Sequence, residues 1–339
     1  MIRNSIASLA AAVLLAGLAA QPSVVKVCRG FLPENALSIP VGSLEDRGIK
    51  QEEFNAVLDT VEKIYRPIVA ERGATLVVNR KWDDNTVNAS AQQSGKKWII
   101  NMYGGLARHA AITQDGFALV ACHEMAHHLG GAPKSSGWVG SWATIEGQAD
   151  YAGNLKCMRR VLSDASSSGF TRPRSDDPIA VETCDKAFSA PADKLVCLRG
   201  VMAGKSVSAL FKALSNDAKD PQLNTPDPAV VAAMYQKHPK TQCRLDTYFQ
   251  GSQCGRPVSE EVSDTDVFSG TCNAKTGQSS GLRPRCWYKP PAGEPQLLSM
   301  PAVIAEVSWT PAGPGPVHPQ RTFVGAFSEL MSQELWKGR

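Results

Sequence analysis

The segment ACHEMAHHLGG, residues 121–131, places three of the chain's six histidines and one glutamate within six consecutive positions. In an α-helix, at about 100° per residue, His123 and His127 project from one face a turn apart, while His128 points away from them. Two histidines at this spacing, with a glutamate directly after the first, are typical of a zinc site. In such a site the glutamate acts as the general base for a zinc-bound water. The segment therefore predicts a helix with His123 and His127 as zinc ligands and Glu124 as the general base.

The residues around this segment favour the helix. Thr113 is the expected N-cap, and Gly130-Gly131 is the expected stop. An apolar stripe at helical spacing consists of Ala118, Cys122, Met125, Ala126 and Leu129. We expect this stripe to anchor the helix, with the histidine pair on the neighbouring face.

A catalytic zinc site takes three protein ligands and keeps a fourth position open, so a third ligand is expected downstream. The segment TIEGQADYAG, residues 144–153, lies within a helical run expected over Trp142–Val161 and carries Glu146 and Asp150 on one face. We expect Glu146 to be the third ligand. Asp150 is then placed to accept the outer ring N–H of a ligand histidine and fix its tautomer. The alternative is a carboxylate pair on a solvated helix face.

The preceding residues predict an α+β fold that is mostly helical with a small β-sheet. Residues 51–73 carry apolar side chains at the period of an amphipathic helix. TLVVNRKW (75–82) and KKWIINMY (96–103) are expected strands, separated by a turn at 83–85. An exposed strand beside the histidine helix can hold an extended peptide through main-chain hydrogen bonds. The alternative is that both strands belong to the core.

Four segments in this order resemble the gluzincin zinc endopeptidases that include the CAAX prenyl proteases and the HtpX-like and BepA-like enzymes. Residues 87–109 are similar to that family's Asn-Ala-x-Ala hairpin with its following strand and Gly-Leu turn. ACHEMAH is similar to its zinc helix, EGQAD to its Glu-x-x-x-Asp helix, and HPKTQCR (238–244) to its His-Pro-x-x-x-x-Arg segment. The resemblance covers about residues 50–250. The chain departs from the family in the Gly-rich residues that follow the zinc helix and in lacking the membrane helices of many members.

The resemblance implies a zincin-type metallopeptidase domain that binds Zn²⁺ and hydrolyses protein or peptide substrates. It also implies that His238 donates to the oxyanion, with Arg244 orienting His238 or the nearby carboxylates. The alternative for His238 is a structural histidine before Pro239.

The N-terminus indicates export. Arg3 precedes an apolar run from Ile6 to Ala20 that ends in small residues, which is typical of a cleaved signal peptide. An uncleaved anchor is the alternative. We expect a signal peptide at 1–20, a lead segment at 21–49, a zinc metallopeptidase domain at 50–251 and a Pro/Cys-rich C-terminal appendage at 252–339. The appendage is expected to be irregular or β-rich, with a helix over 324–336.

The nine cysteines fit a periplasmic or secreted protein, because disulfides persist in such compartments. We expect Cys122, on the apolar stripe, to be buried and free. The other eight are expected to form up to four disulfides: Cys28, Cys157, Cys184, Cys197, Cys243, Cys254, Cys272 and Cys286.

These features favour an exported zinc endopeptidase with a protein or peptide substrate. The net charge of +4, without a basic run, gives no indication of a nucleic-acid partner. After signal cleavage no transmembrane segment is expected. Two other classes stay open: a periplasmic quality-control or chaperone-like zinc protein with weak proteolysis, and a disulfide-stapled secreted binding protein whose zinc is not catalytic. His109, His128 and His318 are expected to have surface or packing roles, or no visible chemistry.

Overall fold

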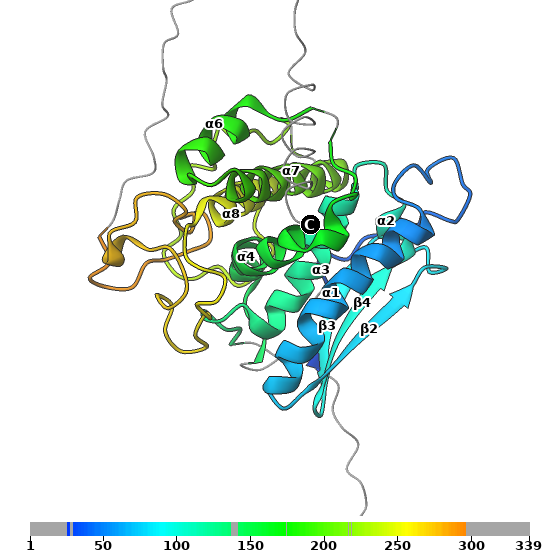
Figure 1. The fold of residues 1–339 in the computed structure, drawn as a ribbon, viewed down its shortest axis with the longest axis horizontal. Helices are drawn as coiled ribbons and strands as arrows, with labels where there is room; N and C mark the ends of the chain where they lie inside the picture. Colours follow the sequence, from blue (N-terminus) through cyan, green and yellow to red (C-terminus); the bar gives the residue numbers. More distant parts are fainter. Residues whose placement is uncertain are drawn as a thin grey trace, which may run out of the picture. The chain divides into compact units, whose positions relative to one another are not determined.

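The computed structural model describes residues 26–27, 30–136, 142–173, 175–215, 217 and 219–295. It has the expected α+β fold, with a small mixed sheet and a larger set of helices (Figure 1). The predicted signal peptide at 1–20, Cys28, His318 and the helix predicted at 324–336 lie outside the described residues. Within the described part, none of the helices combines the length and hydropathy that crossing a bilayer requires.

The sheet contains four strands, in the order β1 (Lys26–Val27), β3 (Ala89–Ser94), β4 (Lys97–Tyr103) and β2 (Thr75–Lys81). β3 and β4 form an antiparallel hairpin, and its turn contains Gly95 at φ 57°, a conformation that favours glycine. β2 pairs with β4 in parallel. The strands expected at 75–82 and 96–103 are confirmed. β1 pairs antiparallel with β3, so residues close to the N-terminus line the outer side of β3.

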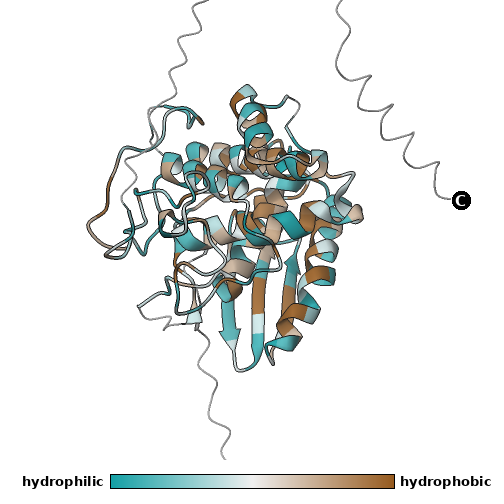
Figure 2. Ribbon diagram, turned by 60° about the vertical axis from the view of Figure 1, so that its left-hand side comes forward, coloured by the Kyte–Doolittle hydropathy of each residue, from teal (hydrophilic) through white to brown (hydrophobic). Residues whose placement is uncertain are grey.

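Helix α1 (Gln51–Glu71) confirms the amphipathic helix expected at 51–73. Its apolar face, with Phe54, Val57 and Val61 fully buried, packs against β2 and α3. Hydrophobic and hydrophilic residues alternate along it in Figure 2. Glu53 accepts a hydrogen bond from the Lys50 backbone N–H at 2.7 Å, which satisfies a donor at the start of the helix.

Helix α3 (Gln114–Leu129) carries the histidine segment and begins as expected, with the Thr113 side chain accepting a hydrogen bond from the Gly116 N–H at 3.1 Å. It is buried on all sides rather than along one apolar stripe, since every residue from Gln114 to His128 is buried. The reason is its central place among α1, β3, β4 and α7 (Pro191–Leu214).

The helical run expected from Trp142 begins later. The Thr144 N–H donates to His127 O in α3 (3.0 Å), and the Ile145 N–H donates to Pro133 O in the loop after it (3.1 Å). These bonds tie the two residues to α3 and its loop instead of starting a helix. The helix starts at Glu146 and continues through three segments, α4 (Glu146–Ala152), the π-helix η2 (Gly153–Met158) and α5 (Arg159–Ser163).

The remaining helical elements are α2 (Gly104–Ala107), η3 (Ala165–Ser167), α6 (Pro178–Ala187), α8 (Thr241–Gln253) and η4 (Ala274–Thr276). α7 packs against α3, α6 and α8, and α8 packs against α4 (Figure 1). The described part of the predicted appendage is irregular apart from η4. Its Trp287 is fully buried, and the ring lies so close to Gly147 in α4 that a Cβ there would be 2.3 Å from it.

Four disulfides join the eight described cysteines, and they correct the prediction that Cys122 is free. Cys122 is buried as expected, but it is bonded to Cys157 in η2, because α3 and η2 pack together at this point. The other three bonds are Cys184–Cys197, Cys243–Cys286 and Cys254–Cys272. Four disulfides fit an oxidising compartment.

Candidate metal centre

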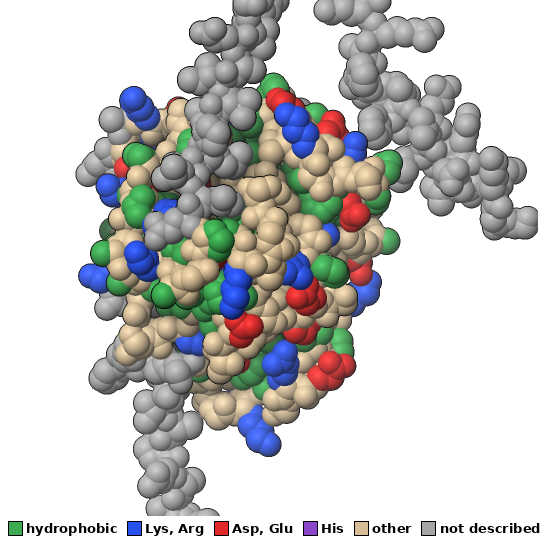
Figure 3. Space-filling model, turned by 90° about the vertical axis from the view of Figure 1, so that its left-hand side faces the viewer, with side chains coloured by type: hydrophobic (Ala, Val, Ile, Leu, Met, Phe, Trp, Pro, Cys, Tyr) green, Lys and Arg blue, Asp and Glu red, His purple; other side chains and the backbone are tan. Residues whose placement is uncertain are grey.

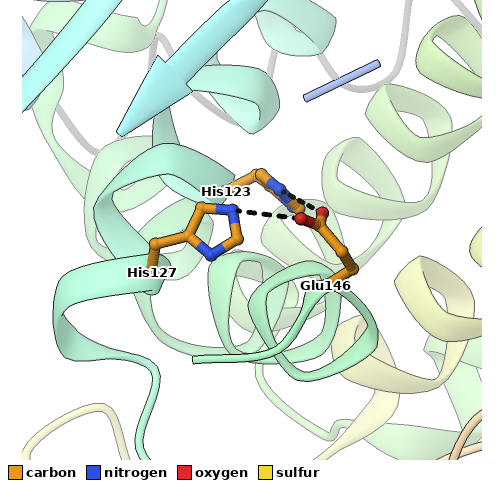
Figure 4. Close-up of side chains that lie close together, drawn as sticks. All are labelled: His123, His127 and Glu146. Atoms are coloured by element: carbon orange, nitrogen blue, oxygen red, sulfur yellow. Dashed lines mark ion pairs between the residues drawn. The ribbon is translucent and has the colours of Figure 1, made fainter. Parts of the chain in front are cut away.

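Three predicted ligands converge between α3 and the first turn of α4. His123 and His127 project from α3 toward Glu146, and Figure 4 shows both rings facing its carboxylate. His123 Nε2 lies 3.3 Å from Glu146 Oε2, and His127 Nε2 lies 3.9 Å from Glu146 Oε1. One ligand atom from each residue lies within 4.8 Å of the other two. These three residues therefore form a possible metal-binding cluster.

The outer ring nitrogens of both histidines are held by hydrogen-bond acceptors. His123 Nδ1 donates to Asp150 Oδ1 at 2.7 Å, and His127 Nδ1 donates to the carbonyl oxygen of Thr144 at 2.8 Å. When the ring is neutral and Nδ1 carries its proton, Nε2 presents a lone pair toward Glu146. This is the arrangement in which an imidazole binds a metal through Nε2.

The inner atoms of the cluster have no hydrogen-bond partner. His123 Nε2, His127 Nε2, Glu146 Oε2 and both carboxylate oxygens of Glu124 are buried without one. A buried polar atom without a partner costs about 1–3 kcal/mol, so five such atoms in one place call for a bound group. Two imidazole nitrogens and a carboxylate oxygen are a donor set that suits zinc. The residues present fit that ion.

The charges of these groups are strongly coupled. Burial opposes ionisation of Glu146, but His127 and His123 outweigh it and lower the pKa of Glu146 to about 2. Burial also opposes protonation of His123, but Asp150 outweighs it and raises the pKa of His123 to about 9. Burial dominates at the other two positions: it lowers the pKa of His127 to about 4 and raises the pKa of Glu124 to about 8. The charges of His123 and Glu146 also act on the pKa of Glu124, His123 lowering it and Glu146 raising it.

Asp150 is the centre of a buried network behind His123. The Arg244 guanidinium in α8 donates to both oxygens of the Asp150 carboxylate, at 2.7 and 2.8 Å, and Tyr248 donates to Oδ1 at 2.6 Å. Burial opposes the charge of Asp150, but Arg244 and His123 hold the pKa of its carboxyl well below the usual range. Sequence analysis did not single out Tyr248, although its spacing of four residues from Arg244 places both on one face of α8.

His238 lies at the edge of the same cluster, before the start of α8. Its Nε2 donates to the carbonyl oxygen of Gly30 at 2.8 Å and lies 3.5 Å from Glu146 Oε2. In this arrangement Nε2 carries a proton. The same nitrogen is then not available as a metal ligand.

The other described histidines are not part of the cluster. His128 stacks between Trp98 and Trp142, at ring-centre distances of 5.3 and 5.0 Å, and burial lowers its pKa to about 3. His109 accepts a hydrogen bond from the Ala111 N–H at 3.2 Å. Both have packing or local hydrogen-bonding environments. A second group of possible ligands, Asp227 with Cys243 and Cys286, offers no free thiolate, because its two cysteines form a disulfide.

The cluster is closed to solvent. His123, Glu124 and His127 are completely buried, and Glu146 has 6% of its surface exposed. The Phe31 ring contacts the His123 ring edge-on at 4.9 Å, and the Gly30 carbonyl oxygen accepts a hydrogen bond from His238 at the edge of the cluster. On the molecular face in Figure 3, acidic and basic side chains are interspersed rather than separated by sign.

Comparison of the chain with protein-family models, curated proteins and solved structures finds no match. A functional assignment therefore depends on the geometry of the cluster and on the sequence motifs that form it.

Proposed function

We propose that this protein is an exported zinc-dependent endopeptidase of the gluzincin type, with His123, His127 and Glu146 as the metal ligands. The observation that carries the proposal is the set of five buried polar atoms without partners, three on the ligands and two on Glu124. A site that only stabilises the fold has no need of a buried carboxylate that neither binds the metal nor accepts a hydrogen bond. A hydrolytic site needs one, to accept a proton from water.

A zinc ion held here would supply a water of lowered pKa and polarise the substrate carbonyl. Glu124 accepts the proton from the attacking water and passes it to the amine that leaves. Water adds across the amide bond, so one product ends in a carboxylate and the other begins with an amino group. The complete burial of Glu124 keeps its carboxylate from being solvated by bulk water.

His238 and Arg244 have separate roles in this proposal. His238 Nε2 already donates to a peptide carbonyl, that of Gly30, and the same N–H can donate to the oxygen of a substrate carbonyl as negative charge develops on it. Arg244 holds Asp150, which in turn holds the ring of His123. Arg244 is therefore a positioning residue for the metal ligands.

The test compares Glu124→Gln with Glu146→Ala in the mature, oxidised protein. Glu124→Gln should keep stoichiometric zinc and lower hydrolysis of a mixed peptide library at least about a hundredfold, because it removes only the proton acceptor. Glu146→Ala should lose zinc as well, because it removes a ligand. Metal content by mass spectrometry and cleavage products by liquid chromatography give both readouts. Full turnover in Glu124→Gln would remove Glu124 from the mechanism.

A further inference from the structure

We infer that the groups of Asn88, Ala89, His238 and Arg244 that surround Gly30–Leu32, here together called the groove, bind an extended peptide beside the metal cluster. In this inference residues Gly30–Leu32 of this chain are the resident peptide and keep the site latent. The part of the inference that concerns latency rests on the proposed peptidase function, because only an enzyme can be latent. The placement of the segment is independent of that function. We call Gly30–Leu32 the covering segment.

The covering segment is held through its backbone. The Phe31 N–H donates to Ala89 O at 2.8 Å, continuing along β3 from the pairing that β1 makes with Gln92 and Gln93. The Asn88 side chain accepts from the Leu32 N–H at 2.9 Å and donates to Leu32 O at 3.2 Å. These contacts involve only main-chain groups of the covering segment. The same donors and acceptors can therefore hold another extended peptide of different sequence.

The Phe31 carbonyl is held from the opposite side of the groove. Arg244 Nη1 donates to Phe31 O at 2.8 Å, while the other guanidinium nitrogens of Arg244 hold Asp150. Next to it, His238 donates to Gly30 O. Two successive carbonyls of the covering segment are therefore bound, one by His238, which the proposed mechanism places at the substrate carbonyl, and one by Arg244, which holds Asp150.

The Phe31 side chain packs in the hydrophobic core next to the metal cluster. It is completely buried and contacts the rings of His123 and Phe211 at 4.9 and 5.2 Å, with the Arg244 guanidinium 4.6 Å above it. Aromatic and cationic neighbours of this kind suit a large apolar or aromatic side chain. The groove is therefore suited to peptides that carry such a residue at the position of Phe31.

Gly30 explains why the covering segment blocks the groove rather than presenting a bond for cleavage. Its φ of 84° is a backbone conformation that L side chains rarely adopt, so an ordinary substrate residue does not follow the same path. A Cβ there would also lie 3.1 Å from Asn88 Oδ1 and 3.2 Å from Ala89 O. The chain turns out of extended geometry at Gly30, directly beside His238.

Substrate must displace the covering segment, so weakening the segment should expose the groove. Gly30→Ala does this at the point where the backbone is left-handed and crowded. Gly42→Ala is the matched control, because Gly42 has a similar φ of 72° but a Cβ at that position would meet nothing within 4 Å. Both variants place an alanine at a left-handed backbone position. Only Gly30→Ala places it next to Asn88 and Ala89 in the groove.

The probe is a fluorescein-labelled peptide with the sequence of residues 24–37 and serine in place of Cys28, VVKVSRGFLPENAL. Binding is measured by anisotropy on the zinc-loaded mature chain, with Glu124→Gln present in every variant to prevent turnover. Gly30→Ala should bind the peptide at least about tenfold more tightly than the Gly42→Ala control, because the competing segment is released. A peptide with aspartate at the phenylalanine should lose this binding.

A second pair of variants removes a buried phenyl ring. Phe31→Ala and Phe54→Ala both delete a fully buried side chain from the same core, so both should lower the melting temperature. Only Phe31→Ala should increase peptide binding, and with Glu124 restored it should increase hydrolysis of a short peptide by a similar factor.

Equal peptide affinity in Gly30→Ala and Gly42→Ala, with Phe31→Ala no different from Phe54→Ala, would overturn the inference. Cleavage of the wild-type chain between Gly30 and Phe31, seen by intact mass, would also overturn it, because the segment would then be a substrate. Tighter peptide binding without hydrolysis in any variant would leave the groove and its covering segment standing and refute the peptidase. Full hydrolysis by the wild type that is unchanged in Gly30→Ala would support the peptidase function and refute the covering segment.

Discussion

Replacing Asp150 by asparagine tests the buried network behind the metal cluster. Oδ1 of Asp150 accepts from His123, Arg244 and Tyr248, and Oδ2 accepts from Arg244 Nε at 2.8 Å. An asparagine that keeps its oxygen toward the three donors turns its amide N–H groups toward Arg244 Nε, where a donor meets a donor. The Arg244 guanidinium, 2% exposed, also loses its counter-ion.

Two separate losses follow from this change. Breaking a buried ion pair by removing one partner costs about 3–5 kcal/mol of unfolding free energy. His123 also loses the carboxylate that fixes its tautomer and ring orientation, and removal of such a partner typically lowers metal affinity about 10- to 100-fold. We therefore expect Asp150→Asn to lower both stability and zinc affinity.

Asp115→Asn separates the two effects. Asp115 is also completely buried and pairs with Arg199 through two hydrogen bonds of 2.7 and 2.9 Å. These two hydrogen bonds do not involve a metal ligand. Urea unfolding should show a comparable loss in both variants. Zinc affinity, measured by competition with a chelator, should fall only in Asp150→Asn. Wild-type zinc affinity in Asp150→Asn, or an equal loss in Asp115→Asn, would refute the assignment of Asp150 as the orienting partner of His123.

Two further predictions concern stability. Replacing both members of Cys122–Cys157 by alanine should lower the unfolding free energy by about 2–4 kcal/mol. This loss should exceed that from removing Cys184–Cys197, because the sequence separation of the bonded cysteines is 35 rather than 13. Denaturant titration of both variants shows which of them loses more stability. Burial raises the pKa of Asp246 to about 7 from 3.8, so its protonated form stabilises the fold fully below pH 4, and that contribution is lost as the pH rises through 7. Asp246→Asn should therefore gain stability relative to wild type between pH 4 and pH 8, by at most about 4 kcal/mol, and a difference that is independent of pH would contradict this.

The arrangement of the metal cluster could be predicted from spacing alone. A spacing of four residues fixes His123 and His127 on one face of a helix, and the same spacing fixes Glu146 and Asp150 on another, whatever surrounds them. The structure brings the two faces together and adds the His123–Asp150 hydrogen bond expected for such a pair. Helix periodicity is a local property of the sequence. The residues that share a helix face could therefore be predicted without knowledge of the tertiary fold.

The errors came from contacts between distant segments. The apolar stripe correctly placed Cys122 in the core, but stripe membership does not identify which neighbour packs there, and the neighbour is Cys157. The predicted start of the helix at Trp142 was wrong because Thr144 bonds to His127 in α3 and Ile145 bonds to Pro133 in the loop after it. The covering segment gave no periodic signal, because its own main-chain groups make the contacts and their partners come from distant parts of the chain: Asn88, His238 and Arg244.

The covalent bonds of the molecule are distributed in a way that suits a latent site. Cys122–Cys157 ties α3, which carries the two histidines, to η2 directly after α4, and Cys243–Cys286 ties the start of α8 to the region of Trp287. The helix that carries the two histidines is therefore covalently fixed to the segment after α4, and the start of α8, which carries Arg244, is fixed to the region of Trp287. None of the four disulfides among the described cysteines includes a residue of the stretch 30–49, which contains the covering segment. Along that stretch the attachment is non-covalent, through hydrogen bonds and the packing of Phe31, so the covering segment can leave the groove without any change in the bonds that keep the metal cluster in place.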